Sequence, residues 1–127
     1  MAMKQANAAQ KQWMKDISDA CQYGVIGALY GEEYDDCANW QLHHVKGRSF
    51  KHNKVSIGHW LILPVPFDLH DVSSNHPLNV THHKNAFTNE FGMQTELMGD
   101  LINLMGAMGV YKLPPDKVLE AIEDLNA

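Results

Sequence analysis

The stretch Trp40-Gln41-Leu42-His43-His44-Val45-Lys46-Gly47-Arg48 decides how this chain is organised. Apolar and polar residues alternate through its first half, which predicts a short strand over 40–45 whose successive side chains point to opposite faces. The adjacent histidines, His43 and His44, therefore point apart. Both can serve one site only if the strand ends there, and Gly47 permits such a break because it tolerates a left-handed backbone.

Working towards the C-terminus, the pattern continues as loop, strand and helix. A polar, basic loop over 48–56 leads to an apolar run over 59–65, which is too short for a helix and predicts a second strand. His70 follows in a turn or the first turn of a helix. A helix is then expected over 82–91, beginning at His82-His83 and stopped by Gly92.

Helices are predicted on both sides of this core. An amphipathic helix is expected over 3–21, and the glycine-interrupted segment 24–31 fits either a broken helix or a loop. The stripe of leucine and methionine over 94–108 predicts a helix that packs in the core or forms a dimer face. Pro114-Pro115-Asp116 opens a last short helix.

The length of 127 residues suits one α+β domain with a modest core. We divide it into an N-terminal helical region over 1–36, a strand–strand–helix core over 40–92 and C-terminal helices over 93–127. No apolar run reaches the roughly 20 residues of a membrane span, and no signal peptide is apparent. The expected location is the cytoplasm. Cys21 and Cys37 are too few for a disulfide scaffold and are expected to be buried or indifferent thiols.

The charge distribution restricts where nucleic acid can bind. A net charge of −5 argues against a broad nucleic-acid surface. However, the segment from Val45 to Phe67 contains no acidic residue and four basic ones, namely Lys46, Arg48, Lys51 and Lys54. One basic loop on an acidic body fits local contact with a phosphate backbone.

Histidine is the compositional anomaly, since all eight lie between His43 and His83. An imidazole near its ordinary pKa of about 6.5 can accept a proton from water at neutral pH. Neutral imidazoles also bind zinc and other first-row divalent ions. Taken singly, His52, His59 and His76 fit loop or strand-face residues better than ligands.

Several linked motifs extend this pattern: His43-His44-x-x-Gly47-Arg48, then Leu63-Pro64 with His70, then His82/His83 with Lys84, Phe87, Phe91-Gly92 and Glu96-Leu97. Together they resemble the HNH (His-Me finger) nucleases, and most closely the phage Ref family of recombination-enhancing, RecA-dependent nucleases. The resemblance covers over a third of the chain.

The resemblance implies a ββα-metal core and the roles of its residues. His44 would be the general base, with Arg48 and Lys46 contacting phosphate and with Lys51 and Lys54 also facing DNA. One divalent metal ion, zinc or magnesium/manganese, would be held by His43, His70 and either His82 or His83.

The chain also departs from the family pattern. Where the family has LPLCxxHH, this chain runs from Leu63 to His70 without the cysteine and with one histidine fewer, and the family's upstream cysteine pair is missing. An additional structural zinc is therefore not implied.

The sequence predicts a metal-dependent DNA endonuclease, set in phage recombination and acting with a RecA filament if the resemblance holds. One alternative is a degenerate HNH fold that binds DNA or a protein without catalysis. Another is a helical interaction protein that forms a homodimer through its methionine stripe.

Overall fold

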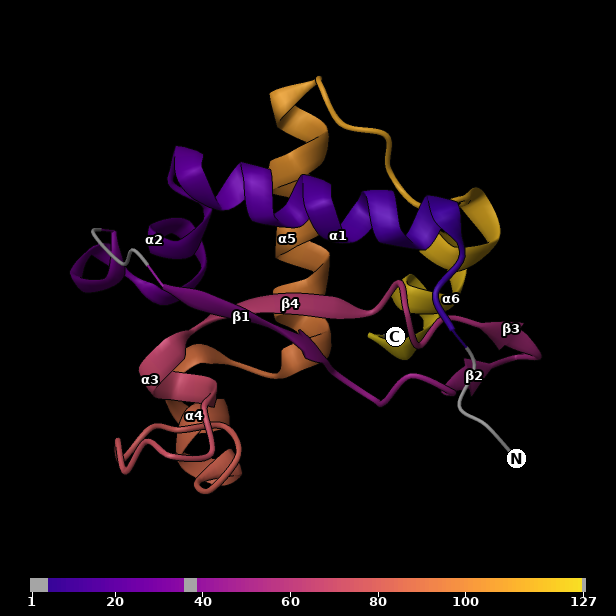
Figure 1. The fold of residues 1–127 in the computed structure, drawn as a ribbon. Helices are drawn as coiled ribbons and strands as arrows, with labels where there is room; N and C mark the ends of the chain where they lie inside the picture. The colour runs from indigo at the N-terminus through magenta and orange to yellow at the C-terminus, as the bar shows by residue number, and fades with distance from the viewer. Residues whose placement is uncertain (1–4, 36–38, 127) are drawn as a thin grey trace.

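The centre of the fold is a two-stranded antiparallel sheet of β1 (Trp40–His44) and β4 (Ile62–Pro66) (Figure 1). The computed structural model describes residues 5–35 and 39–126. In the register of the sheet, His43 lies opposite Leu63 and His44 opposite Ile62. The predicted α+β class is confirmed. The two predicted strands also form, the second beginning three residues later and ending one residue later than expected.

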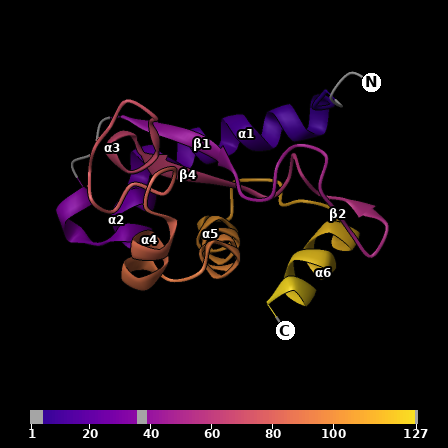
Figure 2. The same ribbon diagram turned by 90° about the horizontal axis from the view of Figure 1, so that it is seen from below.

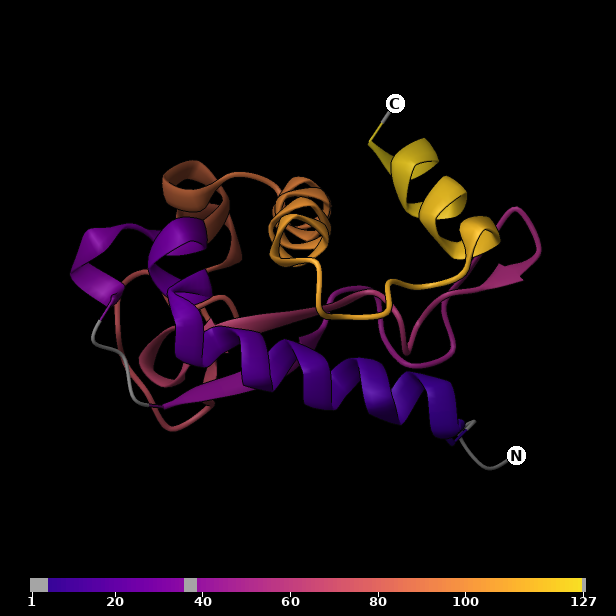
Figure 3. The same ribbon diagram turned by 90° about the horizontal axis from the view of Figure 1, so that it is seen from above.

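Helices cover both faces of this sheet. Seen from below and from above, the sheet lies between α1 (Ala8–Ala20) and α5 (Gln94–Met108) (Figures 2 and 3). Every residue of β4 is buried as a result. A strand that is buried on both faces has a continuous run of apolar residues instead of alternating apolar and polar ones, and β4 has such a continuous run.

The first helix begins at a capping box, in which Asn7 and Gln10 each bond the other's backbone N–H. Its buried face includes Trp13, whose Nε1 donates to the Trp60 carbonyl at 3.1 Å and fastens the helix to the approach to β4. The predicted helix over 3–21 is thus present over most of its length; its first residues lie outside the described part of the chain.

The ambiguous glycine segment is a broken helix. A 3-10 turn η1 (Cys21–Tyr23) ends at Gly24, whose φ of +90° separates it from α2 (Val25–Tyr30). A second 3-10 turn, η2 (Glu32–Tyr34), follows. Cys21 is buried, whereas Cys37 lies outside the described residues.

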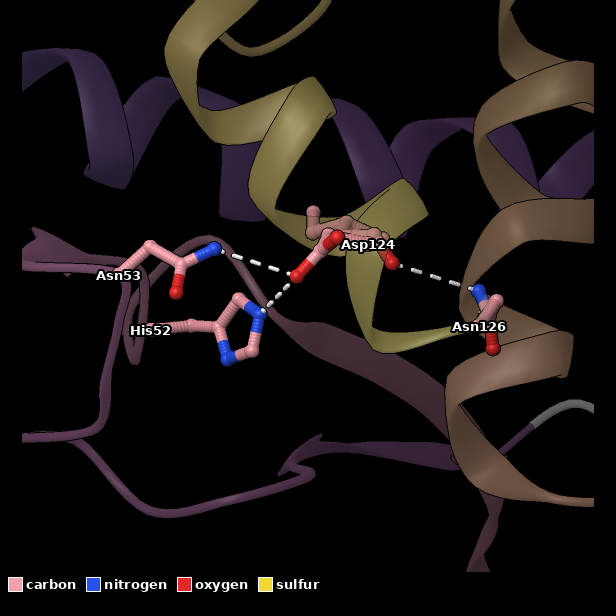
Figure 4. Close-up of polar contacts among 5 residues, drawn as sticks. His52, Asn53, Asp124 and Asn126 are labelled. Atoms are coloured by element: carbon pink, nitrogen blue, oxygen red, sulfur yellow. Dashed lines mark hydrogen bonds and ion pairs between the residues drawn. The ribbon is translucent and has the colours of Figure 1, made fainter.

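The basic loop contains a hairpin that the sequence did not predict. Strands β2 (Lys51–His52) and β3 (Val55–Ser56) pair across Asn53 and Lys54, both with positive φ. The hairpin is fastened to α6 (Asp116–Leu125) because Asp124 accepts hydrogen bonds from His52 Nε2 at 2.6 Å and Asn53 Nδ2 at 3.1 Å (Figure 4).

After β4 the chain forms α3 (Phe67–His70), a long loop and α4 (Lys84–Phe91). Rings from three segments hold α4 in place, with centroids 5.0 to 6.4 Å apart; they belong to Tyr30, Tyr34, Phe87 and Phe91. The Tyr30 hydroxyl also donates to the Pro64 carbonyl at 2.6 Å, which links this cluster to β4.

The bounds of α5 coincide with the predicted 94–108. Met98 and Met105 are fully buried in the core, so the methionine stripe packs inside the chain. No helix in the described ranges has the length and apolar character needed to cross a bilayer.

Candidate metal and catalytic site

Two of the predicted ligands meet. His43 leaves one face of β1 near its end, and His70 is the last residue of α3. Their rings approach edge to face, with His43 Nδ1 and His70 Nε2 3.1 Å apart, although the residues are 27 positions apart in the sequence. The strand and the following helix therefore bring both imidazoles to one place.

Two glutamines fix which nitrogen of each ring carries hydrogen. Gln41 donates from Nε2 to Asp71 Oδ1 at 2.9 Å, so its carbonyl Oε1 faces His70 Nδ1, at 2.5 Å. The carbonyl Oε1 of Gln94 lies 2.7 Å from His43 Nε2. A carbonyl oxygen only accepts, so His70 Nδ1 and His43 Nε2 carry the hydrogens.

In the neutral rings, the two nitrogens that face each other are therefore both acceptors. A pair of lone pairs 3.1 Å apart makes no hydrogen bond and needs a proton or a metal cation between them. Burial lowers the pKa of His43 to about 4 and lowers that of His70, which disfavours the proton at neutral pH. The donor set therefore fits a cation bound by neutral imidazoles.

The spacing agrees with this reading. With zinc–nitrogen bonds of about 2.05 Å, two ligand nitrogens lie about 2.9 Å apart at octahedral angles and about 3.3 Å apart at tetrahedral ones. The separation of 3.1 Å falls between the two values. The chain Asp71–Gln41–His70 is the kind of outer hydrogen-bonded support that orients metal-binding histidines.

His44 occupies the opposite face of β1. Its Nε2 lies 3.2 Å from Nδ1 of His59, a buried residue on the approach to β4. Burial lowers the pKa of His44, and the nearby charges of His59 and Arg48 lower it further. The ring is therefore neutral at neutral pH. β1 ends at His44, which contacts His59 on the face opposite to His43 and His70.

The loop that carries Arg48 is held by close backbone packing. A Cβ on Gly58 would lie 2.2 Å from the Arg48 carbonyl oxygen, so only glycine fits there. Gly47 has a φ of +85°, as the predicted break after the strand requires. Together they fix the turn that carries Arg48, whose charge is near enough to contribute to lowering the His44 pKa.

The other two predicted ligands do not join the pair. His82 bonds through Nε2 to the Val72 carbonyl at 2.8 Å, and His83 is an exposed residue at the start of α4. Over residues 5–35 and 39–126, no group of three or more His, Cys, Asp or Glu side chains gathers as a metal cluster. The expected third histidine ligand is thus not placed at the pair, since His82 bonds to the Val72 carbonyl and His83 is exposed before α4.

The four basic residues fall into two groups, and all are exposed. Lys46 and Arg48 follow β1 directly and lie near the histidines. Lys51 and Lys54 belong to the β2–β3 hairpin, which extends from the end of the molecule away from α3 and α4 (Figure 1). Only the first pair is close to the candidate site.

Besides Gln41 and its partner Asp71, sequence reasoning missed three residues that shape this site. Asn79 is fully buried, donates from Nδ2 to the carbonyls of Asp68 and Asp71, and accepts from two backbone amides of the following turn. It thereby holds α3 and its His70. The other two, Gln94 and His59, act through tertiary contacts with His43 and His44 and carry no local signal.

Comparisons of the chain with protein-family models, with curated proteins and with solved structures gave no match. The reading of the site therefore rests on its residues and their geometry.

Proposed function

We propose that this protein is a metal-dependent endonuclease of the HNH type that hydrolyses phosphodiester bonds in DNA. The observation that carries the proposal is the pair of acceptor nitrogens, on His43 and His70, that face each other 3.1 Å apart. A neutral His44 at the end of the same strand, with Arg48 beside it, adds the base and the phosphate contact that hydrolysis needs.

His43 and His70 would hold one divalent ion, and Gln41 and Gln94 keep their free nitrogens turned towards it. Such an ion, when bound, neutralises charge on the phosphate and on the leaving oxygen. Two imidazoles leave room around it for water and substrate oxygens, as catalytic sites require.

His44 would act on the attacking water. As the water oxygen forms its bond to phosphorus, its proton passes to His44, the bond to the leaving oxygen breaks, and that oxygen takes a proton from solvent. Arg48 would contact a phosphate oxygen through its guanidinium donors. In this proposal β1, β4 and the helices after them form the ββα-metal core, and DNA held in a RecA filament, in a phage setting, is the substrate that the sequence resemblance suggests.

Nicking of supercoiled plasmid tests the proposal. Wild-type protein with Mg²⁺, Mn²⁺ or Zn²⁺ should nick the plasmid, and chelator should stop it. His44→Ala should lower the rate about 10²–10⁴-fold, which is the usual loss on removing a general base. His76→Ala is the matched control, because that ring only accepts from the Leu78 amide in the same loop region and should leave nicking unchanged. Equal rates for wild type and His44→Ala would refute the assigned base.

A second candidate is a non-catalytic module of the same fold that binds DNA or a protein. It is favoured by the convergence of only two imidazoles and by the engagement of His44 Nε2 with His59. Metal binding by the wild type without nicking, with any of the three ions and with RecA filaments present, would select this candidate.

A further inference from the structure

A small pocket of about 120 Å³ is lined by residues that follow β1, by residues of α4 and by the start of α5. Its wall includes Gln94, the same residue whose carbonyl Oε1 bonds His43 Nε2. The remaining lining residues are Val45, Lys46, Lys84, Thr88, Met93 and Thr95. The pocket therefore adjoins the candidate metal site and shares one residue with it.

The charge of this pocket is positive. Lys46 and Lys84 both line it, and none of its lining residues is acidic. Among the described residues neither lysine forms an ion pair, since the one pair found there joins His52 to Asp124. The Lys84 charge reaches as far as His43, where it contributes to lowering the histidine pKa after the larger effects of burial and neighbouring rings.

The polar groups around the pocket are mainly donors. Each ammonium offers three hydrogens, and the threonine hydroxyls can donate as well. The Gln94 carbonyl is taken by His43, while its amide Nε2 bonds no other residue of the described chain. The volume has room for several water molecules, and so for one tetrahedral oxyanion.

We propose that this pocket binds a phosphate group of a nucleic-acid strand, next to the phosphate that is cleaved. The proposal rests on the function proposed above for its substrate, but the pocket itself is defined by its own residues. Lysine ammonium groups bind phosphate as compact point charges, so two of them lining one pocket suit a tetrahedral oxyanion. Lys84 at the start of α4 and Lys46 after β1 would hold the strand from two sides and set its register across His43 and His44.

The first experiment uses inorganic phosphate alone and metal-free protein, with binding followed by calorimetry. Lys46→Gln and Lys84→Gln should each weaken phosphate binding about tenfold, the usual loss for a charge-assisted hydrogen bond. Lys112→Gln and Lys117→Gln are matched controls, because these exposed lysines lie outside the pocket, and they should leave binding unchanged. If the pocket variants and the control variants weaken phosphate binding equally, or if the wild type does not bind phosphate, the proposed phosphate site is refuted.

The second experiment identifies the source of the phosphate. A short oligonucleotide with a 5′-hydroxyl should compete with inorganic phosphate for the pocket. Such competition would support binding of an internal phosphodiester. Competition by a 5′-phosphorylated oligonucleotide alone would support binding of a strand end instead. If neither competes, the assignment to nucleic acid is overturned and the pocket takes free phosphate only.

Nicking assays separate this proposal from that of the nuclease. In an active enzyme, Lys84→Gln should raise KM with little change in kcat, because it removes binding rather than chemistry. An unchanged KM would refute the proposed binding of phosphate in the pocket without contradicting the proposed nuclease activity. Conversely, the protein could fail to nick plasmid while an oligonucleotide still competes with phosphate in a way that depends on Lys46 and Lys84. That result would support phosphate binding in the pocket and refute the nuclease.

Discussion

Single residues beside the histidine pair determine which ring nitrogens are free. Gln41 and Gln94 each present a carbonyl oxygen to one imidazole, so the hydrogen of each ring lies on the side away from the shared gap. The two glutamines therefore belong to the site as much as the histidines do. Asp71 extends the arrangement, and hydrogen bonds from Ser73 and Gln41 hold the pKa of its carboxyl below the usual range.

The first residue-level prediction concerns metal affinity, measured by calorimetry with Zn²⁺. Gln41→Leu should weaken binding about 10–100-fold, because His70 loses the acceptor that orients it. His43→Ala should weaken binding further, since it removes a ligand. His44→Ala should leave the metal bound, although it stops cleavage. Equal losses for His43→Ala and His44→Ala would show that ligand and base are wrongly assigned.

A second prediction at this scale concerns Asn79. Its fully buried side chain makes four hydrogen bonds to backbone, so Asn79→Ala leaves buried groups unsatisfied and should cost about 2–3 kcal/mol in unfolding free energy. The matched control is Asn75→Ala, an exposed position in the same loop, which should change stability by less than about 0.5 kcal/mol. Urea unfolding of both variants tests this prediction. Similar unfolding midpoints for Asn79→Ala and Asn75→Ala would argue against the role of Asn79 in anchoring α3.

Among the elements, those with strong periodicity were predictable and those built on tertiary contact were not. The apolar stripe predicted α5, whose observed bounds coincide with the predicted 94–108. The β2–β3 hairpin was not predicted because its turn residues are Asn53 and Lys54, whereas Asn-Gly is the sequence that most strongly indicates a two-residue hairpin turn. The meeting of His43 and His70 was implied by the family resemblance, whereas the His44–His59 contact depends on the path of the chain before β4.

The hairpin and the last helix give an element-level prediction about acid. Bonds from His52 and Asn53 hold the pKa of Asp124 below its ordinary value. A lowered carboxyl pKa stabilises the fold at pH values above the ordinary value of about 4 and ceases to do so as pH falls through the lowered one. The stability difference between wild type and Asp124→Asn should therefore be constant near neutrality and shrink below about pH 4.

Stability measured across pH tests this, with Glu120→Gln on the same helix as the control. Glu120 is exposed, and within the described part of the chain it forms no hydrogen bond or ion pair with the hairpin, so its variant should have the same pH dependence as the wild type. A difference between wild type and Asp124→Asn that persists unchanged into acid would contradict the role given to the aspartate.

At the scale of the whole molecule, one thin sheet connects every layer. β4 packs against α1 and α5, while β1 carries both histidines along its length. His43 faces His70 of α3 and is hydrogen-bonded to Gln94 of α5, so a ligand at the pair would join three elements that are distant in sequence. Ligand binding should therefore stabilise the complete fold and not one segment.

The corresponding prediction is a rise in the melting temperature on adding metal. At a free Zn²⁺ concentration 100-fold above Kd, binding contributes about 2.7 kcal/mol, which should raise Tm by roughly 10 °C in a domain of this size. Chelator should reverse the rise. His43→Ala should show none, while His76→Ala should respond as the wild type does. A similar shift in His43→Ala would place the ion elsewhere.

Because side chains alternate along β1, the register of this strand decides which histidine faces His70 and which faces His59. A slip of one residue against β4 would bring either His44 or Leu42 to the place of His43, so that only one of the two imidazole pairs survives. The place of Gln41 would pass to Trp40 or Leu42, neither of which can accept from His70. Insertions and deletions inside this strand are therefore expected to be far more damaging than those in the turn that follows it.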